Sequence, residues 1–190
     1  MERTKQRELA DRAAAGEETA WREIYEQTRD RLFALLCYHV GDREEALDVL
    51  QDTYLHAIRS IGRFRDEGSL EGWLAVIALR RAADWRRRVW TRLRRHVPLE
   101  DTRASLAVDP PEVPLAGESR RLREGLARLS SRQRTALLLR ELEGLRFAQI
   151  AEALGCSEAT ARVHHLRARE RLQSLLAAGT SRGAALCAEE

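Results

Sequence analysis

The sequence FAQIAEALGCSEATARVHHLRARERL occupies residues 147–172 and contains the most specific local pattern of the chain. Its apolar spacing predicts a short helix that ends at Gly155, a residue that can adopt the left-handed backbone of a tight turn. Ser157 is suited to cap a longer, arginine-rich helix after the turn. This order of elements is typical of a helix-turn-helix, so the stretch predicts DNA binding. The alternative is an ordinary helical hairpin with a solvated face.

The two helices predicted here need one face for mutual packing and one for the ligand. The apolar residues spaced to hold the pair together are Ile150, Leu154, Ala161 and Leu166. Side chains near the start of a recognition helix reach base edges, whereas arginines further along contact phosphates. The residues predicted to face outward are Ser157, Glu158, Thr160, Arg162, Val163, His164 and Arg167.

Helical spacing continues upstream of this stretch and stops at a proline-rich segment. Leu122, Leu126 and Leu129 predict one helix, and Ser130 or Ser131 is suited to cap the next.

Residues 91–117 lose this periodicity. All four prolines fall in or beside that span: Pro98, Pro110, Pro111 and Pro114. Because proline blocks a helix, we predict a flexible, partly extended linker. Residues 118–178 then form a DNA-binding domain, and 179–190 a disordered tail.

Residues 5–90 carry a second set of helical stripes, and strand patterns are nearly absent from the whole chain. One stripe runs from Trp21 to Val40 and closes at residues 41–42. The next stripe belongs to a second helix, and it places these residues on one face: Ala46, Leu47, Leu50, Tyr54, Ala57, Ile58 and Ile61. The predicted fold is therefore all-α, with two small helical domains joined by the linker.

The second of these helices carries an acidic patch beside its apolar stripe. Asp48, Gln51 and Asp52 lie at positions i, i+3 and i+4, which share one helix face. With Glu44 and Glu45 they predict a surface for the basic face of a partner protein. The alternative is a solvated helix face.

A loop over residues 62–72 follows the acidic helix and contains glycine and serine. Phe64 offers a stacking surface for an unpaired base, and Arg63 and Arg65 offer positive charge. Ser69 is suited to cap the helix that follows. We predict base capture by this loop, with a plain surface loop as the alternative.

The helix after the loop carries arginines around a tryptophan, a combination that suits a DNA backbone. A solvated helix end is the alternative. The candidate DNA-binding residues are Arg80, Arg81, Trp85, Arg86, Arg87 and Arg88, with Arg92, Arg94 and Arg95 extending the charge.

Composition excludes several other classes of protein. The net charge of +3 is too small for a polycation, so local arginine patches carry more meaning than the total. Three separated cysteines predict neither a zinc site nor a disulfide framework. Cys37 and Cys156 are interpreted as small buried residues, with a redox sensor as the alternative. No catalytic triad, metal cluster or nucleotide-binding glycine loop is visible, which predicts no enzymatic activity, metal or cofactor.

The chain also has no apolar run of the roughly 20 residues that a membrane span requires. Its N-terminus, MERTKQRELADR, is charged and does not resemble a signal peptide. We therefore predict a soluble, cytoplasmic protein without membrane insertion.

In this order, the features resemble the extracytoplasmic-function (ECF) branch of bacterial sigma factors. The resemblance covers about residues 20–88 and 119–172. It rests on two stretches, AWREIYEQTRDRLFALLCYHVGDREEALDVLQDTYLHAIRSIGRFRDEGSLEGWLAVIALRRAADWRRR and LREGLARLSSRQRTALLLRELEGLRFAQIAEALGCSEATARVHHLRARERL. Two linked blocks at the expected separation are far more specific than a lone helix-turn-helix.

The resemblance implies a role for each block. The first block looks like sigma region 2, in which Asp48, Gln51 and Asp52 would dock on the clamp helices of core RNA polymerase. The loop from Phe64 to Leu70 would capture a flipped base of the promoter −10 element. The arginine-rich helix would hold the duplex edge and the non-template strand.

The second block looks like region 4, which reads the −35 element in the major groove. The matching recognition-helix positions are Arg162, His164, His165, Arg167 and Arg169. The linker would thread toward the RNA exit path of the polymerase. The resemblance further implies promoter melting driven by binding energy, and inhibition by an anti-sigma factor that covers the polymerase- and DNA-binding faces.

One residue and one run of three depart from the common family pattern. Arg80 stands where many members carry asparagine, and residues 163–165 read Val-His-His where serine and arginine are frequent. We therefore expect promoter preference to differ from the common pattern. Two rival functions are a helix-turn-helix regulator that binds DNA without polymerase, and a pure protein-interaction module such as a sigma-sequestering decoy.

Overall fold

The computed structural model describes residues 3–64, 69–96 and 117–186. Its helices are α1 (Arg3–Ala14), α2 (Glu18–Val40), α3 (Arg43–Ser60), η1 (Ile61–Arg63), α4 (Leu70–His96), α5 (Gly117–Ala127), α6 (Ser131–Glu141), α7 (Phe147–Leu154) and α8 (Glu158–Leu186). These ranges contain no strand, and the predicted all-α class is confirmed.

Helices α1 to α4 form what we call the N-terminal unit, in which α2, α3 and α4 pack on one another and α1 packs on α2. The turn between α2 and α3 follows from local chemistry. Gly41 closes α2 with a φ of 93°, which is the left-handed region that favours glycine. Asp42 caps α3 by accepting a hydrogen bond from the backbone N–H of Glu45 at 2.9 Å. The predicted helix boundary at this turn is confirmed.

Helices α5 to α8 form the C-terminal unit, in which α6 and α7 both pack on α8. Ser130 and Gln133 make a reciprocal capping box at the start of α6, so the predicted serine cap is confirmed at the first of the two positions. Gly155 ends α7 with a φ of 62°. Ser157 Oγ then accepts from the Thr160 backbone N–H at 3.2 Å and caps α8.

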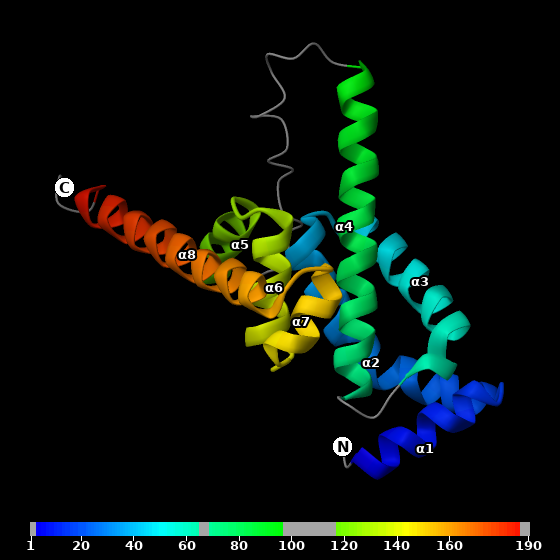
Figure 1. The fold of residues 1–190 in the computed structure, drawn as a ribbon. Coiled ribbons are helices and arrows are strands. Elements are labelled where there is room, and N and C mark those ends of the chain that lie inside the picture. Colours follow the sequence, from blue (N-terminus) through cyan, green and yellow to red (C-terminus); the bar gives the residue numbers. More distant parts are fainter. Residues whose placement is uncertain (1–2, 65–68, 97–116, 187–190) are drawn as a thin grey trace.

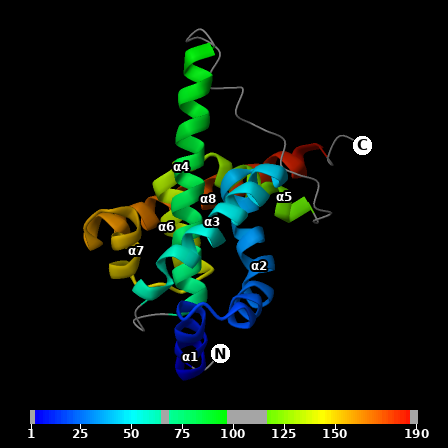
Figure 2. The ribbon, with the colours of Figure 1, turned by 90° about the vertical axis from the view of Figure 1, so that its right-hand side faces the viewer.

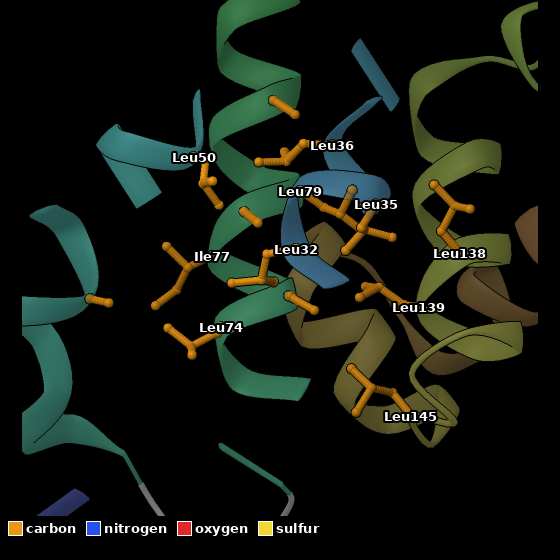
Figure 3. Close-up of a cluster of buried hydrophobic side chains, with 14 of the residues drawn as sticks. Leu32, Leu35, Leu36, Leu50, Leu74, Ile77, Leu79, Leu138, Leu139 and Leu145 are labelled. Carbon is orange, nitrogen blue, oxygen red and sulfur yellow. The ribbon is translucent and has the colours of Figure 1, made fainter. Parts of the chain in front are cut away.

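In Figure 1, α4 lies between α3 on one side and α6 and α7 on the other, and in both views its C-terminal half extends beyond the other helices (Figures 1 and 2). One continuous cluster of buried side chains includes residues from both units. Figure 3 shows this cluster, with α4 leucines beside residues of α2 and with Leu138 and Leu139 contributed by α6. The two units therefore share a hydrophobic interface in this structure.

Predicted core positions in α3 and α8 are wrong. Leu47 and Ile58 of α3 are 49% and 50% exposed, and Leu166 of α8 is 55% exposed. In α3, Val49 and Thr53 are buried instead. Leu47 and Ile58 lie beside the buried stripe of a helix that packs against neighbours on only one side, so spacing alone placed the stripe too wide.

Two helices are longer than predicted. Helix α4 continues to His96, so residues 91–96 of the predicted linker are helical before Pro98, and prolines disfavour helix at the preceding residue. Helix α8 continues through Gly179 to Leu186, where a disordered tail was predicted. That segment holds two alanines and two glycines, so its composition did not indicate a helix. The predicted linker over 97–116 lies outside the described residues.

None of the helices in the described ranges combines the length and apolarity that a membrane crossing requires. The same ranges contain no group of three His, Cys, Asp or Glu side chains placed to hold a metal ion. Cys37 and Cys156 are both free and half-buried, although each was predicted to be buried.

Candidate nucleic-acid interface

The helix-turn-helix is built from α7, the Gly155 turn and α8. Ile150 and Ala151 of α7 are buried, and so are Ala161 and Ala168 on the facing side of α8. Small alanines at these positions allow the two helices to pack closely. This packing leaves the other face of α8 exposed, as a recognition helix requires.

The predicted −35 residues divide between the two faces of α8. The side chains that lie on the exposed face are those of Arg162, Val163, Arg167 and Arg169, while Ser157 is exposed in the cap before the helix. Thr160 and His164 are half-buried. Burial lowers the pKa of His164, and the neighbouring charges of Arg132 and Arg167 lower it further.

His165 differs from the other predicted readers because it faces the core of the C-terminal unit. His165 is only 8% exposed, and its Nε2 lies 2.7 Å from Glu141 Oε1 on α6. Its ring also packs edge-on against Phe147, with 5.4 Å between ring centroids. In this arrangement His165 ties α6 and α7 to α8 and does not share the surface presented by Arg162.

The acidic patch lies on the solvent side of α3. Asp48, Gln51 and Asp52 are all exposed, as the helical spacing predicted. Leu47 and Ile58, which were expected in the core, lie exposed on the same helix, and so does Leu55 at 47%. The surface of α3 therefore combines carboxylates with solvent-exposed apolar side chains.

The residues predicted to capture a base lie where η1 meets the start of α4. Phe64 is only 6% exposed and packs edge-on against Trp73, with 5.7 Å between ring centroids. Ser69 caps α4 by accepting a hydrogen bond from the Gly72 N–H at 2.9 Å. Arg63 is exposed, whereas Arg65 lies outside the described residues. The aromatic ring predicted to stack on a base is thus covered in this arrangement.

A groove of about 730 Å³ connects this region to the helix-turn-helix. From the N-terminal unit it is lined by Arg63, Phe64, Ser69, Trp73 and Arg80, among others; from the C-terminal unit by Leu145, Gln149, Glu152 and Ala153. Four of the predicted −10 residues, Arg63, Phe64, Ser69 and Arg80, therefore face α7 across this groove.

Arg80 crosses the boundary between the two units. Its Nη2 donates to the carbonyl oxygen of Glu152 at 2.8 Å, and its Nε donates to that of Ala153 at 3.0 Å. These carbonyls belong to the last turn of α7, where the helix dipole favours a cation. The residue that departs from the family pattern is thus bound to the helix-turn-helix.

The other arginines of the α4 run lie in varied surroundings. Arg81 pairs with Asp84 at 3.3 Å and approaches Asp52 of the acidic patch at 3.9 Å. Arg86 is half-buried, and burial lowers its pKa. Arg87 pairs with Asp84 at 3.0 Å. Trp85 is half-buried and Arg88 is exposed.

Two further arginines bridge the units in the same manner as Arg80. Arg31 of α2 donates from Nη2 to the carbonyl oxygen of Leu142, just after α6, at 2.6 Å, and pairs with Glu143 at 3.2 Å. Arg134 of α6 donates from Nη1 to the carbonyl oxygen of His39 in the last turn of α2. Each of the three guanidiniums thus lies at the C-terminal end of a helix in the other unit.

Sequence reasoning missed these bridging residues. His39 and Arg134 are both buried, and His39 Nε2 lies 3.1 Å from Thr135 Oγ1. Arg134 and Thr135 stand immediately before the apolar run of α6, and this position indicated a buried polar contact. The partner in α2, however, is about a hundred residues away in sequence and only packing brings it near.

Two family models match separate parts of the chain. The model of sigma-70 region 2 matches residues 24–92, and the model of sigma-70 region 4 matches residues 119–172. The ECF RNA polymerase sigma-E factor of Haemophilus influenzae is 32% identical over 179 residues, which cover 87% of this chain and 92% of that protein. The chain belongs to the ECF family of RNA polymerase sigma factors.

Other sigma factors show the same similarity. The ECF sigma factor BldN of Streptomyces coelicolor is 32% identical over 173 residues, which cover 89% of this chain but 65% of BldN. The sigma factor RpoE of Bartonella quintana, solved with the anti-sigma factor NepR, matches with a TM-score of 0.65 and 25% identity. That match covers 82% of this chain and 95% of RpoE.

The family assigns names to the two units of this sigma factor. The N-terminal unit contains region 2 and the C-terminal unit contains region 4. The solved structure of CnrH with the cytosolic domain of CnrY, 24% identical with a TM-score of 0.64, shares the fold over 91% of this chain and 97% of CnrH. The groove between η1, α4 and α7 therefore lies between region 2 and region 4.

Proposed function

We propose that this sigma factor binds core RNA polymerase through the exposed face of α3 and directs it to promoters by reading two DNA elements. The observation that carries the proposal is that one chain holds both matched regions and exposes Asp48, Gln51 and Asp52 on a single helix face. Neither a DNA-only regulator nor a sigma-sequestering decoy requires all of these features.

The chemistry of the α3 surface supports docking on a protein. Asp48 and Asp52 supply negative charge that complements a basic partner and steers its approach. Leu47, Leu55 and Ile58 are about half exposed and provide apolar area that a partner would remove from water. A merely solvated helix face has no need of three large exposed apolar residues.

Region 4 is proposed to read the −35 element through the exposed face of α8. Arg162 lies near the start of the helix, where side chains reach base edges, and Arg167 and Arg169 lie further along, where they meet phosphates. Val163 is 42% exposed beside Arg162 and offers an apolar contact for a thymine methyl group.

Region 2 is proposed to capture an unpaired −10 base near Phe64 and to hold DNA along the arginines of α4. Binding energy would then offset the few kcal/mol needed to unpair and unstack a base, with no hydrolysis and no enzymatic activity. In the packed arrangement Arg80 is bound to α7 and Phe64 is covered. We therefore infer that region 4 moves away from α4 before region 2 engages the promoter.

The same surfaces suit an inhibitor. The related RpoE was solved with an anti-sigma factor, and we propose that this chain too is held inactive by an anti-sigma factor that covers its polymerase- and DNA-binding faces. Because a bacterial transcription factor must bind chromosomal DNA, we propose a cytoplasmic location.

Reconstituted transcription tests this function. The intact chain is combined with core RNA polymerase and a promoter of the ECF type, and compared with an Asp48→Arg/Gln51→Ala variant. A Glu8→Arg variant is the matched control, because Glu8 is an exposed acidic residue on α1. We expect the intact chain and the control to initiate and the double variant to fail.

Each rival function predicts a different result. If the intact chain binds promoter DNA equally well with and without core polymerase and never initiates, the DNA-only regulator is correct. If it binds neither polymerase nor DNA, the interaction module is correct. If the double variant initiates as well as the intact chain, the proposed docking face is wrong.

A further inference from the structure

Phe147, the first residue of α7, lies at the centre of a cluster formed by three helices. The guanidinium carbon of Arg162 on α8 is 4.6 Å from the centre of its ring, and that of Arg140 on α6 is 4.9 Å from it. His165 packs edge-on against the same ring. Phe147 is half-buried, so its ring lies between the core of region 4 and the exposed start of α8.

The neighbours of the Phe147 ring are themselves fixed in place. Arg140 donates from Nη1 to the carbonyl oxygen of Leu145 at 2.9 Å. His165 lies 2.7 Å from the carboxylate of Glu141. These anchors hold the aromatic ring at a defined position relative to the recognition helix.

Arg162 is restrained from two sides. Its guanidinium lies over the Phe147 ring, and its Nη2 pairs with the carboxylate of Glu158, one helical turn earlier. The Arg162 side chain is nevertheless 59% exposed. Without these restraints an exposed arginine would sample many rotamers. Binding a base would then cost the entropy of fixing a single rotamer.

We propose that Phe147 is a positioning residue for −35 recognition, which holds Arg162 in the orientation that reads a guanine. This inference rests on the proposed function, because it requires α8 to enter the major groove. Guanine is the expected base because an arginine fork donates to its O6 and N7 together. Glu158 supplies the second restraint, and its charge is compensated by Arg162 near the phosphates.

The two partners of Arg162 act differently. The Phe147 ring attracts the cation through its π face and leaves every N–H of the guanidinium free to donate. Glu158 accepts from one edge of the fork, and guanine competes for that edge on binding. Phe147 is therefore the restraint that can persist in the DNA complex.

A selection experiment tests the proposal. Holoenzyme reconstituted with the full chain is bound to a promoter library randomised over the −35 hexamer, and the retained DNA is sequenced. We expect Arg162→Ala to abolish a guanine preference at one position of the hexamer. Phe147→Leu, which keeps apolar volume but lacks the ring, should weaken that preference about two- to fivefold, the range of an exposed cation–π contact.

Three controls separate positioning from loss of structure. Phe147→Tyr keeps the ring face and should show the same guanine preference as the intact chain. Leu154→Ala perturbs the other end of α7 without touching Arg162, and should change no single base position selectively. In an Arg162→Ala background, Phe147→Leu should have no further effect on base preference, because the residue on which it acts is absent.

Failure of the inference can be told apart from failure of the proposed function. If intact holoenzyme enriches no −35 sequence, the proposed function is wrong. If it enriches one, the inference is overturned when Phe147→Leu weakens all positions equally, when Phe147→Tyr behaves like Phe147→Leu, or when the loss persists without Arg162.

Discussion

The Nε of Arg80 in α4 donates a hydrogen bond to the main-chain carbonyl oxygen of Ala153 in α7 at 3.0 Å. This contact joins region 2 to region 4 through a residue predicted to bind DNA. An arginine bound to a helix end is not free to bind a phosphate at the same time. If Arg80 binds the −10 element as proposed, region 4 and that DNA compete for one side chain.

Replacing Arg80 by alanine is expected to loosen the packing of region 4 on α4. A guanidinium at an exposed helix end contributes about 1 kcal/mol, which is about a fivefold change in the ratio of packed to separated chains. Salt screens such contacts, so the variant should expand at lower NaCl than the intact chain. Small-angle scattering across a salt series measures this.

The control for that experiment is Arg22→Ala, because Arg22 is exposed and pairs with Glu18 within α2 itself. It should expand at the same salt concentration as the intact chain. Identical salt midpoints for the Arg80 and Arg22 variants would show that the Arg80 contact contributes nothing to the packing.

His39 should make the packing depend on pH. Burial lowers the pKa of His39 well below its ordinary value of 6.5, and the charges of Arg134 and Arg86 lower it further. As the pH falls through about 6.5, the unfolded or separated chain therefore binds a proton at His39, whereas the packed chain does not. Stability is complete above pH 6.5 and falls below it, by at most about 1.4 kcal/mol per pH unit.

Urea unfolding at pH 7.5 and at pH 5.5 measures this dependence. We expect the intact chain to lose stability between the two, and a His39→Gln variant to lose less, because glutamine binds no proton. Equal losses in both proteins would assign the pH dependence to other groups.

Arg134 should be the most sensitive single position at the boundary of the two units. It is 3% exposed, and burial together with the nearby charge of Arg86 lowers its pKa to about 9. Its guanidinium donates to carbonyl oxygens of residues 126, 127 and 129 as well as to that of His39. Arg134→Met would leave these buried acceptors without a donor and should cost about 2–4 kcal/mol of unfolding free energy.

The same urea measurement checks the Arg134 prediction. Arg134→Lys is the informative companion, since lysine keeps the charge but cannot reach several carbonyls in a planar fork. It should fall between the intact chain and Arg134→Met. A loss below about 0.5 kcal/mol for the methionine variant would contradict the structure at this position.

Gly72→Ala should have opposite effects on α4 and on the contact between the units. A methyl group at Gly72 would lie 2.9 Å from Leu145 Cδ2 of region 4 and 3.1 Å from Ser69 Oγ. Alanine favours helix over glycine by up to about 1 kcal/mol, but Leu145 would have to shift. We expect expansion at lower salt in scattering, with no loss of helical content by circular dichroism. A variant that stays as compact as the intact chain at every salt concentration would show that Leu145 adapts freely.

Local chemistry made part of this fold predictable. The turns at Gly41 and Gly155 and the cap at Ser157 depend on neighbouring residues only, and the structure has them where the sequence placed them. The exposed side chains of Asp48, Gln51 and Asp52 follow from helical spacing in the same way.

The misplaced residues depend on contacts between distant segments. Spacing assigns Leu47 to a stripe but cannot show how wide a face α3 buries. Nothing near Arg80 indicates that its partners are carbonyls of α7, and nothing near His165 indicates that Glu141 draws it inward. Helix packing decides these positions, and a pattern along one helix contains no information about its neighbours.

All three arginines that join the units donate to main-chain carbonyl oxygens of the opposite unit, and Arg31 also pairs with the side chain of Glu143. Every residue type supplies a main-chain carbonyl oxygen. Substitutions in the opposite unit can therefore accumulate without breaking these bonds, provided that the helix still ends at the same place. The exposed face of α8 is thus free to change during evolution while the attachment of region 4 to region 2 is kept.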